Sequence, residues 1–390
     1  MSTATVLEGN TFQRMVELRR TLHEHPELAF QEVQTAEVIM AELDRLGIDY
    51  EYGGKGGAVI GRLEGKDRSA PTVALRAEMD ALPVHERTGL PFASKVSGRM
   101  HACGHDVHMA TVLGAAAHHV QDPPPGNVVY VFQPAEERGG GARVVLESGA
   151  LEGVDAIFAG HVTYHYRVGE IMVSRGTVTA QSDGFGIQIK GKGGHGARPH
   201  EAIDAVVIAG MLITSIQTLV SRETDPVHPS VVTIGKVVAG SAPNVIAEEA
   251  MLEGTIRTTL PAVRKHLHQG IERLGRAAAD LYRADVDVVI RGGYPPVVNS
   301  DREVDIAREA VRLMGGEARV VEQEYPSMGA EDFGFFCKQI PSCYVRYGVR
   351  TETDDYIPLH SPLFDVDERV LEIGAAFLDR VARVAIARLA

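Results

Sequence analysis

The chain has 390 residues, of which 44% are hydrophobic and 23% charged, and its formal net charge is −13. This length exceeds what one compact core usually holds, so we expect a globular protein of two domains. The negative charge, which no basic block offsets locally, argues against a nucleic-acid partner.

The sequence carries no feature typical of a secreted or membrane protein. Residues 1–10 lack a basic segment followed by an apolar run, and no stretch comes close to the about 18 apolar residues of a membrane span. Three cysteines, Cys103, Cys337 and Cys343, make no disulfide framework and fit a reducing compartment. We therefore expect a cytoplasmic protein that does not enter a membrane.

The first part of the chain alternates helix and strand patterns. Residues 11–46 carry apolar side chains at helical spacing, and Pro26 predicts a break into two helices, the second of which ends at Gly47. A helix is predicted over residues 106–120, with Asp106 available as its N-cap. Short β-rich runs surround it at residues 58–63, 72–76 and 128–132. This alternation predicts an α/β layer architecture.

The pattern changes after residue 183. A strand at 185–190 is followed by a helix, two strands, a helix and a strand, at residues 202–219, 231–238, 251–258, 261–281 and 286–290. The order β-α-β-β-α-β predicts an inserted ferredoxin-like α+β domain over residues 184–292. Residues 1–183 and 293–390 then form one split domain, which we expect to be catalytic.

The densest chemical signal is the segment MHACGHDVH at residues 100–108. Zinc and similar divalent metals favour thiolate and imidazole ligands. Cys103 and His105 share a face only in extended chain, so we expect a loop between a strand and a helix, with Gly104 allowing the bend. A single buried cysteine or histidine is usually structural. Three histidines around one cysteine favour a metal site instead.

Two adjacent carboxylates, Glu136 and Glu137, follow the strand at 128–132. Open α/β sheets place their active sites at the carboxyl ends of strands. Neighbouring side chains diverge, so one carboxylate can bind metal while the other accepts a proton from water. A solvated surface pair is the alternative interpretation.

Two more histidines stand in similar places, His161 after an apolar strand and His360 in a later loop. Each alone is a weak signal. Together the chain offers five candidate metal ligands: Cys103, His105, Glu137, His161 and His360. Five ligands suffice for two metal ions when one of them bridges, as a thiolate or a carboxylate can.

Four further residues are candidates for supporting roles. Asp80 lies just beyond a strand, where a carboxylate can orient a ligating histidine. His195 is flanked by glycines that leave it reachable by a ligand. Asn244 supplies an amide, and Arg257 can bind a substrate carboxylate in bidentate fashion. A polar strand end and a surface arginine are the alternatives for Asp80 and Arg257.

These motifs resemble a family of co-catalytic metallo-amidohydrolases and carboxypeptidases that includes aminoacylase, hippuricase and plant auxin-conjugate hydrolases. The similarity is greatest to the branch of hippurate hydrolase, indole-acetyl-amino-acid hydrolase and N-acetyl-diaminopimelate deacetylase. The matching segments run along nearly the whole chain, at residues 22–28, 76–83, 101–108, 134–137, 193–200, 241–245, 254–257, 329–333 and 360–362.

The resemblance implies a zinc-peptidase-like catalytic domain, with a mixed sheet flanked by helices, and a lid domain that also dimerises, giving a homodimer or a dimer-based tetramer. It implies that the five candidate ligands hold two metal ions, with Cys103 as the bridge and Glu136 as the general base. His195 corresponds to a lid histidine that stabilises the oxyanion in the neighbouring subunit's site. Asn244 and Arg257 correspond to substrate-binding positions.

The sequence departs from the wider family in one motif. The ligand pattern His-x-Asp reads Glu78-x-Asp80 here, so the resemblance leaves Asp80 a supporting role at most.

We therefore predict a metal-dependent amidohydrolase that cleaves the amide bond of small N-acyl amino acids or related conjugates with metal-activated water. The two divalent ions can be zinc, manganese, cobalt or nickel. The alternatives are a carboxypeptidase or dipeptidase acting on unblocked peptides, and a catalytically silent binding protein of the same fold.

Overall fold

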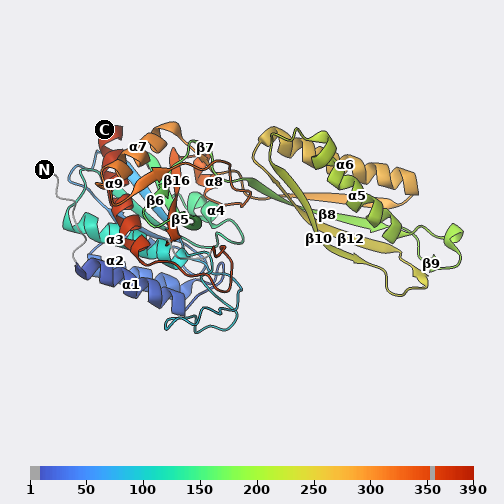
Figure 1. Cartoon of the computed structure of the whole chain (residues 1–390), viewed down its shortest axis with the longest axis horizontal. Helices are drawn as coiled ribbons and strands as arrows, with labels where there is room; N and C mark the ends of the chain where they lie inside the picture. The colour runs from blue at the N-terminus through green and yellow to red at the C-terminus, as the bar shows by residue number, and fades with distance from the viewer. Residues whose placement is uncertain (1–8, 352–355) are drawn as a thin grey trace. The chain divides into compact units, whose positions relative to one another are not determined.

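The computed structural model describes residues 9–351 and 356–390, which divide into two compact units, each with its own hydrophobic core (Figure 1). Unit 1 comprises Met1–Val178, Val298–Tyr325 and Asp332–Ala390, and unit 2 comprises Thr179–Val297 and Pro326–Glu331. Residues 1–8, which carried most of the prediction about a secretion signal, lie outside the described residues.

Unit 1 contains seven α-helices within its described residues: α1 (Gly9–Glu24), α2 (Val33–Leu46), α3 (His105–Gln121), α4 (Gly141–Glu147), α7 (Asp301–Arg312), α8 (Gly334–Cys337) and α9 (Arg369–Leu389). Its strands are β1 (Asp49–Tyr52), β2 (Val59–Leu63), β3 (Thr72–Glu78), β4 (Asn127–Gln133), β5 (Ala156–Arg167), β6 (Glu170–Met172), β7 (Gly176–Thr177), β14 (Val298–Asn299), β15 (Arg319–Val321) and β16 (Ser342–Arg350).

Eight of these strands form one mixed sheet in the order β1-β2-β4-β3-β5-β16-β6-β15. The four central strands β4, β3, β5 and β16 run parallel to their neighbours in this group, whereas β1, β2 and β6 pair in antiparallel fashion. The carboxyl ends of the central strands therefore meet at one edge of the sheet, which is where open α/β sheets place their active sites.

The two faces of this sheet differ in chemistry. On one face, Leu75, Tyr130 and Phe158 pack with apolar residues of α1, α3, α7 and α9 in the core of unit 1. Because successive side chains of a strand point to opposite faces, Arg76 and His161 project from the other side. The second face is therefore buried but partly polar.

The N-terminal helices end where the sequence predicts. Residues 11–46 form two helices, and Pro26 lies in the loop between them. Gly47 adopts the left-handed conformation with φ 68° and caps α2 through backbone bonds to Leu43 and Asp44.

Unit 2 has the ferredoxin-like order that the sequence predicts. Its elements are β8 (Gln181–Lys190), β9 (Gly194–His195), the 3-10 helix η1 (Pro199–Glu201), α5 (Ala205–Glu223), β10 (Ser230–Ala239), β11 (Val245–Ile246), β12 (Glu249–Thr258), α6 (Pro261–Tyr282) and β13 (Asp285–Gly292). Four strands form an antiparallel sheet in the order β10-β12-β8-β13, and α5 and α6 cover one of its faces (Figure 1).

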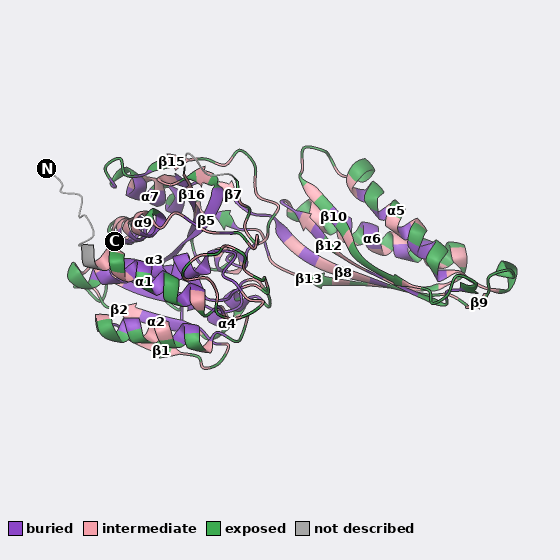
Figure 2. Cartoon of the chain, turned by 60° about the horizontal axis from the view of Figure 1, so that its bottom comes forward, coloured by how far each residue is buried: buried purple, intermediate pink, exposed green. Residues whose placement is uncertain are grey.

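Helix α5 is long and apolar enough to cross a membrane by length and composition, in contrast to the expectation from the sequence. In the structure, Ile208, Leu212 and Ile216 lie at helical spacing and pack into the core of unit 2, and buried and exposed residues alternate around the helix (Figure 2). A core helix passes the same composition test, so this single helix is weak evidence for a membrane span.

Candidate functional site

The loop before α3 presents Cys103 and His105 at the carboxyl edge of the sheet. Gly104 caps the helix with φ 83°, and a Cβ atom there would lie 2.4 Å from Cγ2 of Val162. Only glycine therefore allows α3 to start this close to β5. The expectation that Asp106 caps the helix is wrong. Asp106 is buried within the first turn, and its carboxylate instead accepts hydrogen bonds from Arg19.

His105 is held in one tautomer. Its Nδ1 lies 2.7 Å from the carbonyl oxygen of Asp80, so Nδ1 carries the proton and donates it. Its Nε2 is buried and makes no hydrogen bond within the described part of the chain. A buried polar atom without a partner is unfavourable unless a ligand satisfies it, so this lone pair fits a metal ion.

His161 is oriented in the same way from β5. Its Nδ1 lies 2.7 Å from the carbonyl oxygen of Val162, and its Nε2 lies 3.3 Å from the Cys103 sulfur. Burial lowers the pKa of His161 well below its usual value. The ring is therefore neutral and turns an Nε2 lone pair toward Cys103, as a metal ligand must.

The two glutamates after β4 are held through their backbone by Asp80. The backbone N–H groups of Glu136 and Glu137 each donate to a different carboxylate oxygen of Asp80, both at 3.0 Å. Ala135 just before them has φ 53°, a conformation that side chains other than glycine rarely adopt. Asp80 therefore connects the Glu-Glu turn to the loop that orients His105.

His360 reaches the site from the C-terminal part of unit 1. Its N–H donates to the carbonyl oxygen of Ala102 at 2.8 Å, and its own φ is 67°. Its Nε2 lies 3.2 Å from Oε1 of Glu137, and its side chain is 53% exposed. Strained residues of this kind cluster at functional sites.

The structure thus brings the five predicted ligands together at one edge of the sheet. Single ligand atoms of Cys103, His105 and Glu137 lie within 4.8 Å of one another. His161 adjoins the sulfur of this trio, and His360 adjoins its carboxylate. The assignment of these residues as metal ligands remains a prediction.

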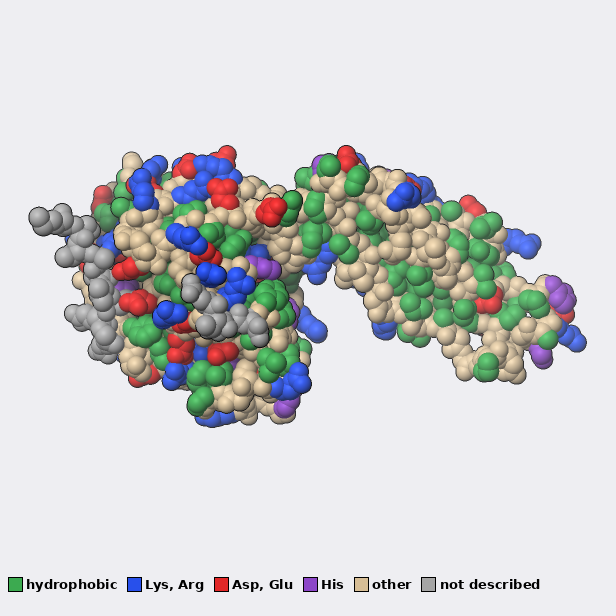
Figure 3. Space-filling model, in the orientation of Figure 1, with side chains coloured by type: hydrophobic (Ala, Val, Ile, Leu, Met, Phe, Trp, Pro, Cys, Tyr) green, Lys and Arg blue, Asp and Glu red, His purple; other side chains and the backbone are tan. Residues whose placement is uncertain are grey.

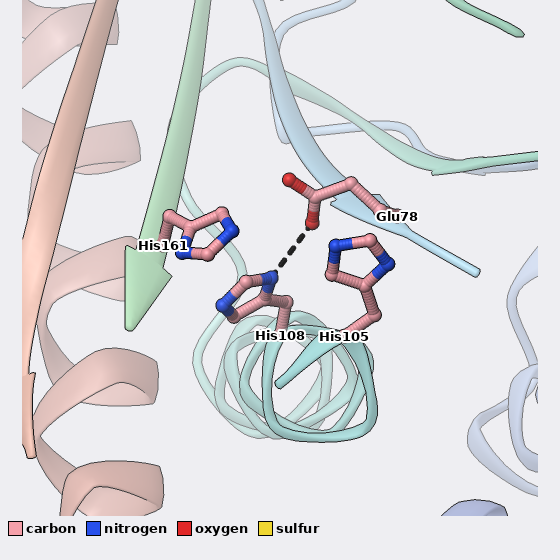
Figure 4. Close-up of side chains that lie close together, drawn as sticks. All are labelled: Glu78, His105, His108 and His161. Atoms are coloured by element: carbon pink, nitrogen blue, oxygen red, sulfur yellow. Dashed lines mark hydrogen bonds and ion pairs between the residues drawn. The ribbon is translucent and has the colours of Figure 1, made fainter. Parts of the chain in front are cut away.

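A second buried cluster, of Glu78, His105, His108 and His161, has ligand atoms equally close together (Figure 4). In this cluster Nδ1 of His108 lies 2.8 Å from Glu78, and its Nε2 accepts the N–H of Val162 at 2.9 Å. Both ring nitrogens are therefore in use. We interpret His108 as a support for the strand that carries His161, because neither of its nitrogens is left for a metal.

Glu78 belongs to a buried network on the same face of the sheet. Arg76 pairs with Glu78, and with Asp332 at 2.9 Å, and Gln133 donates to the same Asp332. Burial alone would raise the pKa of Glu78, but the charge of Arg76 and the hydrogen bond from His108 hold it well below its usual value. Glu78 is therefore ionised, and its charge is balanced without a metal ion.

The trio itself lies in a negative potential. Burial and the charges of Glu137 and Glu136 raise the pKa of the Cys103 thiol well above its usual value. Burial works to lower the pKa of His105, yet Asp80 and Glu78 raise it to about 10. A buried site that disfavours a thiolate and favours an imidazolium is one that a cation stabilises. After Cys103 and His105 release their protons, the thiolate, the imidazoles of His105 and His161 and the carboxylate of Glu137 would form a donor set that suits divalent metals.

Unit 2 carries the other predicted residues. His195 on β9 is exposed, and its Nδ1 accepts the N–H of Ala197 at 3.0 Å, so Nε2 carries the proton. The carbonyl of Asn244 accepts the N–H of Gly196 at 2.8 Å, which holds the His195 loop against the Asn244 loop. Arg257 on β12 is half-buried, and no hydrogen bond or ion pair joins its guanidinium to a described residue. Its charge therefore has no counter-charge within the described part of the chain.

Two supporting residues on α1, Arg19 and His23, are not identified as such by the sequence motifs. Arg19 is buried and bonds Asp106 at 3.0 Å and Asp365 at 3.0 Å, so it joins the first turn of α3 to the segment after His360. His23 donates to the same Asp106 carboxylate at 2.9 Å. The sequence signal that could have identified them is an arginine and a histidine at helical spacing among apolar residues, which places both on the buried face of the helix. By contrast, His101 belongs to none of the clusters of candidate metal ligands among the described residues, and its ring lies 6.5 Å from that of His23.

Comparisons with known proteins agree with this geometry. A family model described as peptidase family M20/M25/M40 matches residues 74–384. N-acetylcysteine deacetylase of Bacillus subtilis is 39% identical over 372 residues, which cover 95% of this chain and 96% of that protein. Thermostable carboxypeptidase 1 of Saccharolobus solfataricus is 39% identical over 368 residues, which cover 93% and 92%. The crystal structure of a dinuclear metal-binding peptidase of Bacillus subtilis superposes with a TM-score of 0.85 at 36% identity, over 97% of this chain and 99% of that chain.

Proposed function

We propose that this chain, which belongs to peptidase family M20/M25/M40, hydrolyses the amide bond of small N-acyl amino acids or related conjugates. Membership confirms the resemblance inferred from its motifs, and with it the enzyme class of metal-dependent amidohydrolase. The observation that carries the proposal is the meeting of Cys103, His105 and Glu137 with His161 and His360. The relative that deacetylates N-acetylcysteine supports this substrate class.

We assign two divalent ions to these five residues, with Cys103 as the candidate bridge. A relative described as a dinuclear metal-binding peptidase supports the number of ions. Zinc, manganese, cobalt and nickel all suit a set of thiolate, imidazole and carboxylate ligands. When bound, such ions would polarise the amide carbonyl and lower the pKa of water from about 15.7 toward about 7.

The residues of the chain would perform the proton transfers. Glu136 is buried beside the candidate ligand Glu137, and we assign it as the base that takes a proton from water and passes one to the leaving amine. Asp80 fixes the backbone of both glutamates. The Nε2–H of His195 would donate to the oxyanion, and Arg257 would bind the substrate carboxylate, with Asn244 as a second polar contact.

We further propose a homodimer that forms through unit 2, which would act as a lid. Strand β10 is an edge strand, and its Val237 and Val238 are 49% and 53% exposed. Val206 and Val207 of α5 are similarly exposed, and Figure 3 shows hydrophobic side chains over the surface of this unit. An exposed apolar edge strand favours pairing with another chain.

We also propose the cytoplasm as the compartment, because free thiols fit a reducing environment.

The test of the catalytic assignment compares two adjacent variants, Glu136→Gln and Glu137→Gln. We expect E136Q to keep its metal and lose turnover, because the base is gone while the ligands remain. We expect E137Q to lose metal. The measurements are metal content and turnover of N-acetyl amino acids. Loss of metal in E136Q together with unchanged turnover per bound ion would refute the assignment.

Loss of the His195 donor should lower turnover by about 100- to 1000-fold.

A carboxypeptidase or dipeptidase is the second candidate function, because a thermostable carboxypeptidase is also a close relative in sequence. Parallel assays of hippurate, N-acetyl amino acids and free dipeptides, after reconstitution with single metals, separate the two. Preference for the blocked amino acids supports an N-acyl-amino-acid hydrolase, and preference for dipeptides supports the second candidate.

A further inference from the structure

Arg346 on β16 lies directly beside the candidate ligand His161. The two residues are in register on parallel neighbouring strands, which lie about 4.8 Å apart, so their side chains leave the same face of the sheet. Tyr344, two positions earlier on β16, confirms this face because its ring lies 6.3 Å from the ring of His161. Val345 and Tyr347, which alternate with Arg346, point into the core on the other side. Arg346 therefore extends from the face that carries the site.

The guanidinium of Arg346 has no counter-charge among residues 9–351 and 356–390. It is half-buried, yet no hydrogen bond or ion pair joins it to any described residue. The nearby Arg76, on the same face of the sheet, is paired with Glu78 and Asp332. A charge that is partly withdrawn from water is unfavourable unless it is paired, so a bound anion would stabilise this one.

Further basic groups lie at this end of β5 and β16. Arg350 follows Arg346 on the same strand, is half-buried and also lacks a partner in the described chain. Burial lowers the pKa of His165 on β5 below its usual value, and the positive charges of Arg346 and Arg350 lower it further. Both guanidinium groups therefore lie close enough to act on this ring. Within the described residues, no ion pair neutralises the two guanidinium groups beside His165, although the whole chain carries a net charge of −13.

We propose that Arg346 forms an anion-binding subsite beside the metal centre, which selects substrates with a second carboxylate in addition to the α-carboxylate. A guanidinium binds a carboxylate through two parallel hydrogen bonds and suits this ligand better than an ammonium. The second carboxylate can stand on the acyl group or on the side chain of the amino acid. The inference rests on the proposed hydrolysis of N-acyl amino acids and names the substrate class within it.

The experiment uses three substrates, N-acetyl-leucine, N-acetyl-glutamate and N-succinyl-leucine, with the metal-loaded full-length enzyme. The variants are Arg346→Met, which removes the charge at similar volume, and Arg346→Lys, which keeps it. Arg380→Met is the matched control, because Arg380 is also a half-buried arginine without a partner in the described residues but lies on α9, against the opposite face of the sheet. Metal content is measured for each protein.

We expect R346M to lower kcat/KM by about 10- to 100-fold for a dicarboxylate substrate, as the loss of a charged hydrogen bond predicts. The same variant should change kcat/KM for N-acetyl-leucine by less than about two-fold, R346K should recover part of the loss, and R380M should change nothing. A loss confined to N-succinyl-leucine places the second carboxylate on the acyl group, and a loss confined to N-acetyl-glutamate places it on the side chain.

Two results overturn the inference and leave the proposed function intact. One is an equal fall for all three substrates in R346M, which would make Arg346 a support for the metal site. The other is wild-type hydrolysis of N-acetyl-leucine with no effect of R346M on either dicarboxylate. Failure of the metal-loaded wild-type enzyme to hydrolyse any of the three substrates counts against the proposed function itself.

Discussion

Replacing Asp80 with asparagine tests how the site is held together. One carboxylate oxygen of Asp80 accepts the N–H of Glu136 and the other accepts that of Glu137, both at 3.0 Å. Asparagine has one oxygen and one NH2 group of nearly the same shape. In either orientation of the amide, one backbone N–H therefore faces another donor. The substitution removes one hydrogen bond and the charge without changing the volume.

The expected losses of metal affinity and turnover in D80N follow from these two hydrogen bonds. A hydrogen bond to a charged group contributes about 1.5–3 kcal/mol, and an unsatisfied buried donor costs a similar amount. The turn that carries Glu137 should shift as a result, and loss of such a support typically lowers metal affinity by about 10- to 100-fold. Glu136 moves with the same turn, and a displacement of about 1 Å at a reacting group can lower turnover by about 100-fold.

The assay is metal affinity by equilibrium dialysis, with kcat measured at saturating metal. Asp155→Asn is the matched control, because Asp155 accepts the N–H of Thr72 at 2.9 Å where β3 begins, away from the carboxyl edge that carries the site. We expect D155N to keep wild-type affinity and turnover. Wild-type metal affinity and wild-type kcat in D80N would refute the reasoning that Asp80 positions the two glutamates.

Three further predictions concern stability. Gly104→Ala should lower the melting temperature by about 5–10 °C, because it combines an unfavourable positive φ with a 2.4 Å contact to Val162; an unchanged melting temperature would contradict the close approach of α3 to β5. His119 and Arg383 hold the pKa of buried Asp379 at about 2 against the opposing effect of burial, so the carboxylate should contribute about 2 kcal/mol that is present above pH 3.8 and lost as the pH falls toward 2. Denaturant unfolding of Asp379→Asn should then show a deficit at pH 7 that disappears near pH 2, whereas a deficit independent of pH would exclude this origin. Chelation should lower the melting temperature and readdition of metal restore it, since ions that bind only the folded chain stabilise it by about 2.7 kcal/mol at 100 times their dissociation constant; a demetallated protein that melts like the loaded one would show that the ions do not support the fold.

Local patterns in the sequence predict the helices and strands and the chemical nature of the candidate ligands. Apolar spacing, Pro26 and Gly47 placed the ends of α1 and α2, because helix periodicity and backbone conformation are local properties. The order of the strands and helices in unit 2 was sufficient to predict its ferredoxin-like topology. The chemical nature of the candidate ligands could also be predicted from short motifs, because thiol, imidazole and carboxylate groups rarely cluster in a few residues without a common function such as metal binding.

The hydrogen-bond partner of each side chain, by contrast, depends on how the elements pack together. Asp106 looked like a helix cap, but Arg19 and His23 from α1 take its carboxylate. His108 belonged to the same motif as His105, yet contacts to Glu78 and to Val162 occupy both of its nitrogens. These pairings depend on how helices dock on the sheet, which no local pattern encodes.

The position of Arg346 beside the candidate substrate site also depends on the tertiary structure. In the sequence it is one arginine in an apolar strand. It stands beside His161 because β16 pairs with β5 in one register, and a shift of one residue would turn its side chain to the core face. Strand register is set by the packing of the whole sheet, so the neighbours of an arginine across two strands become known only when the chain is folded.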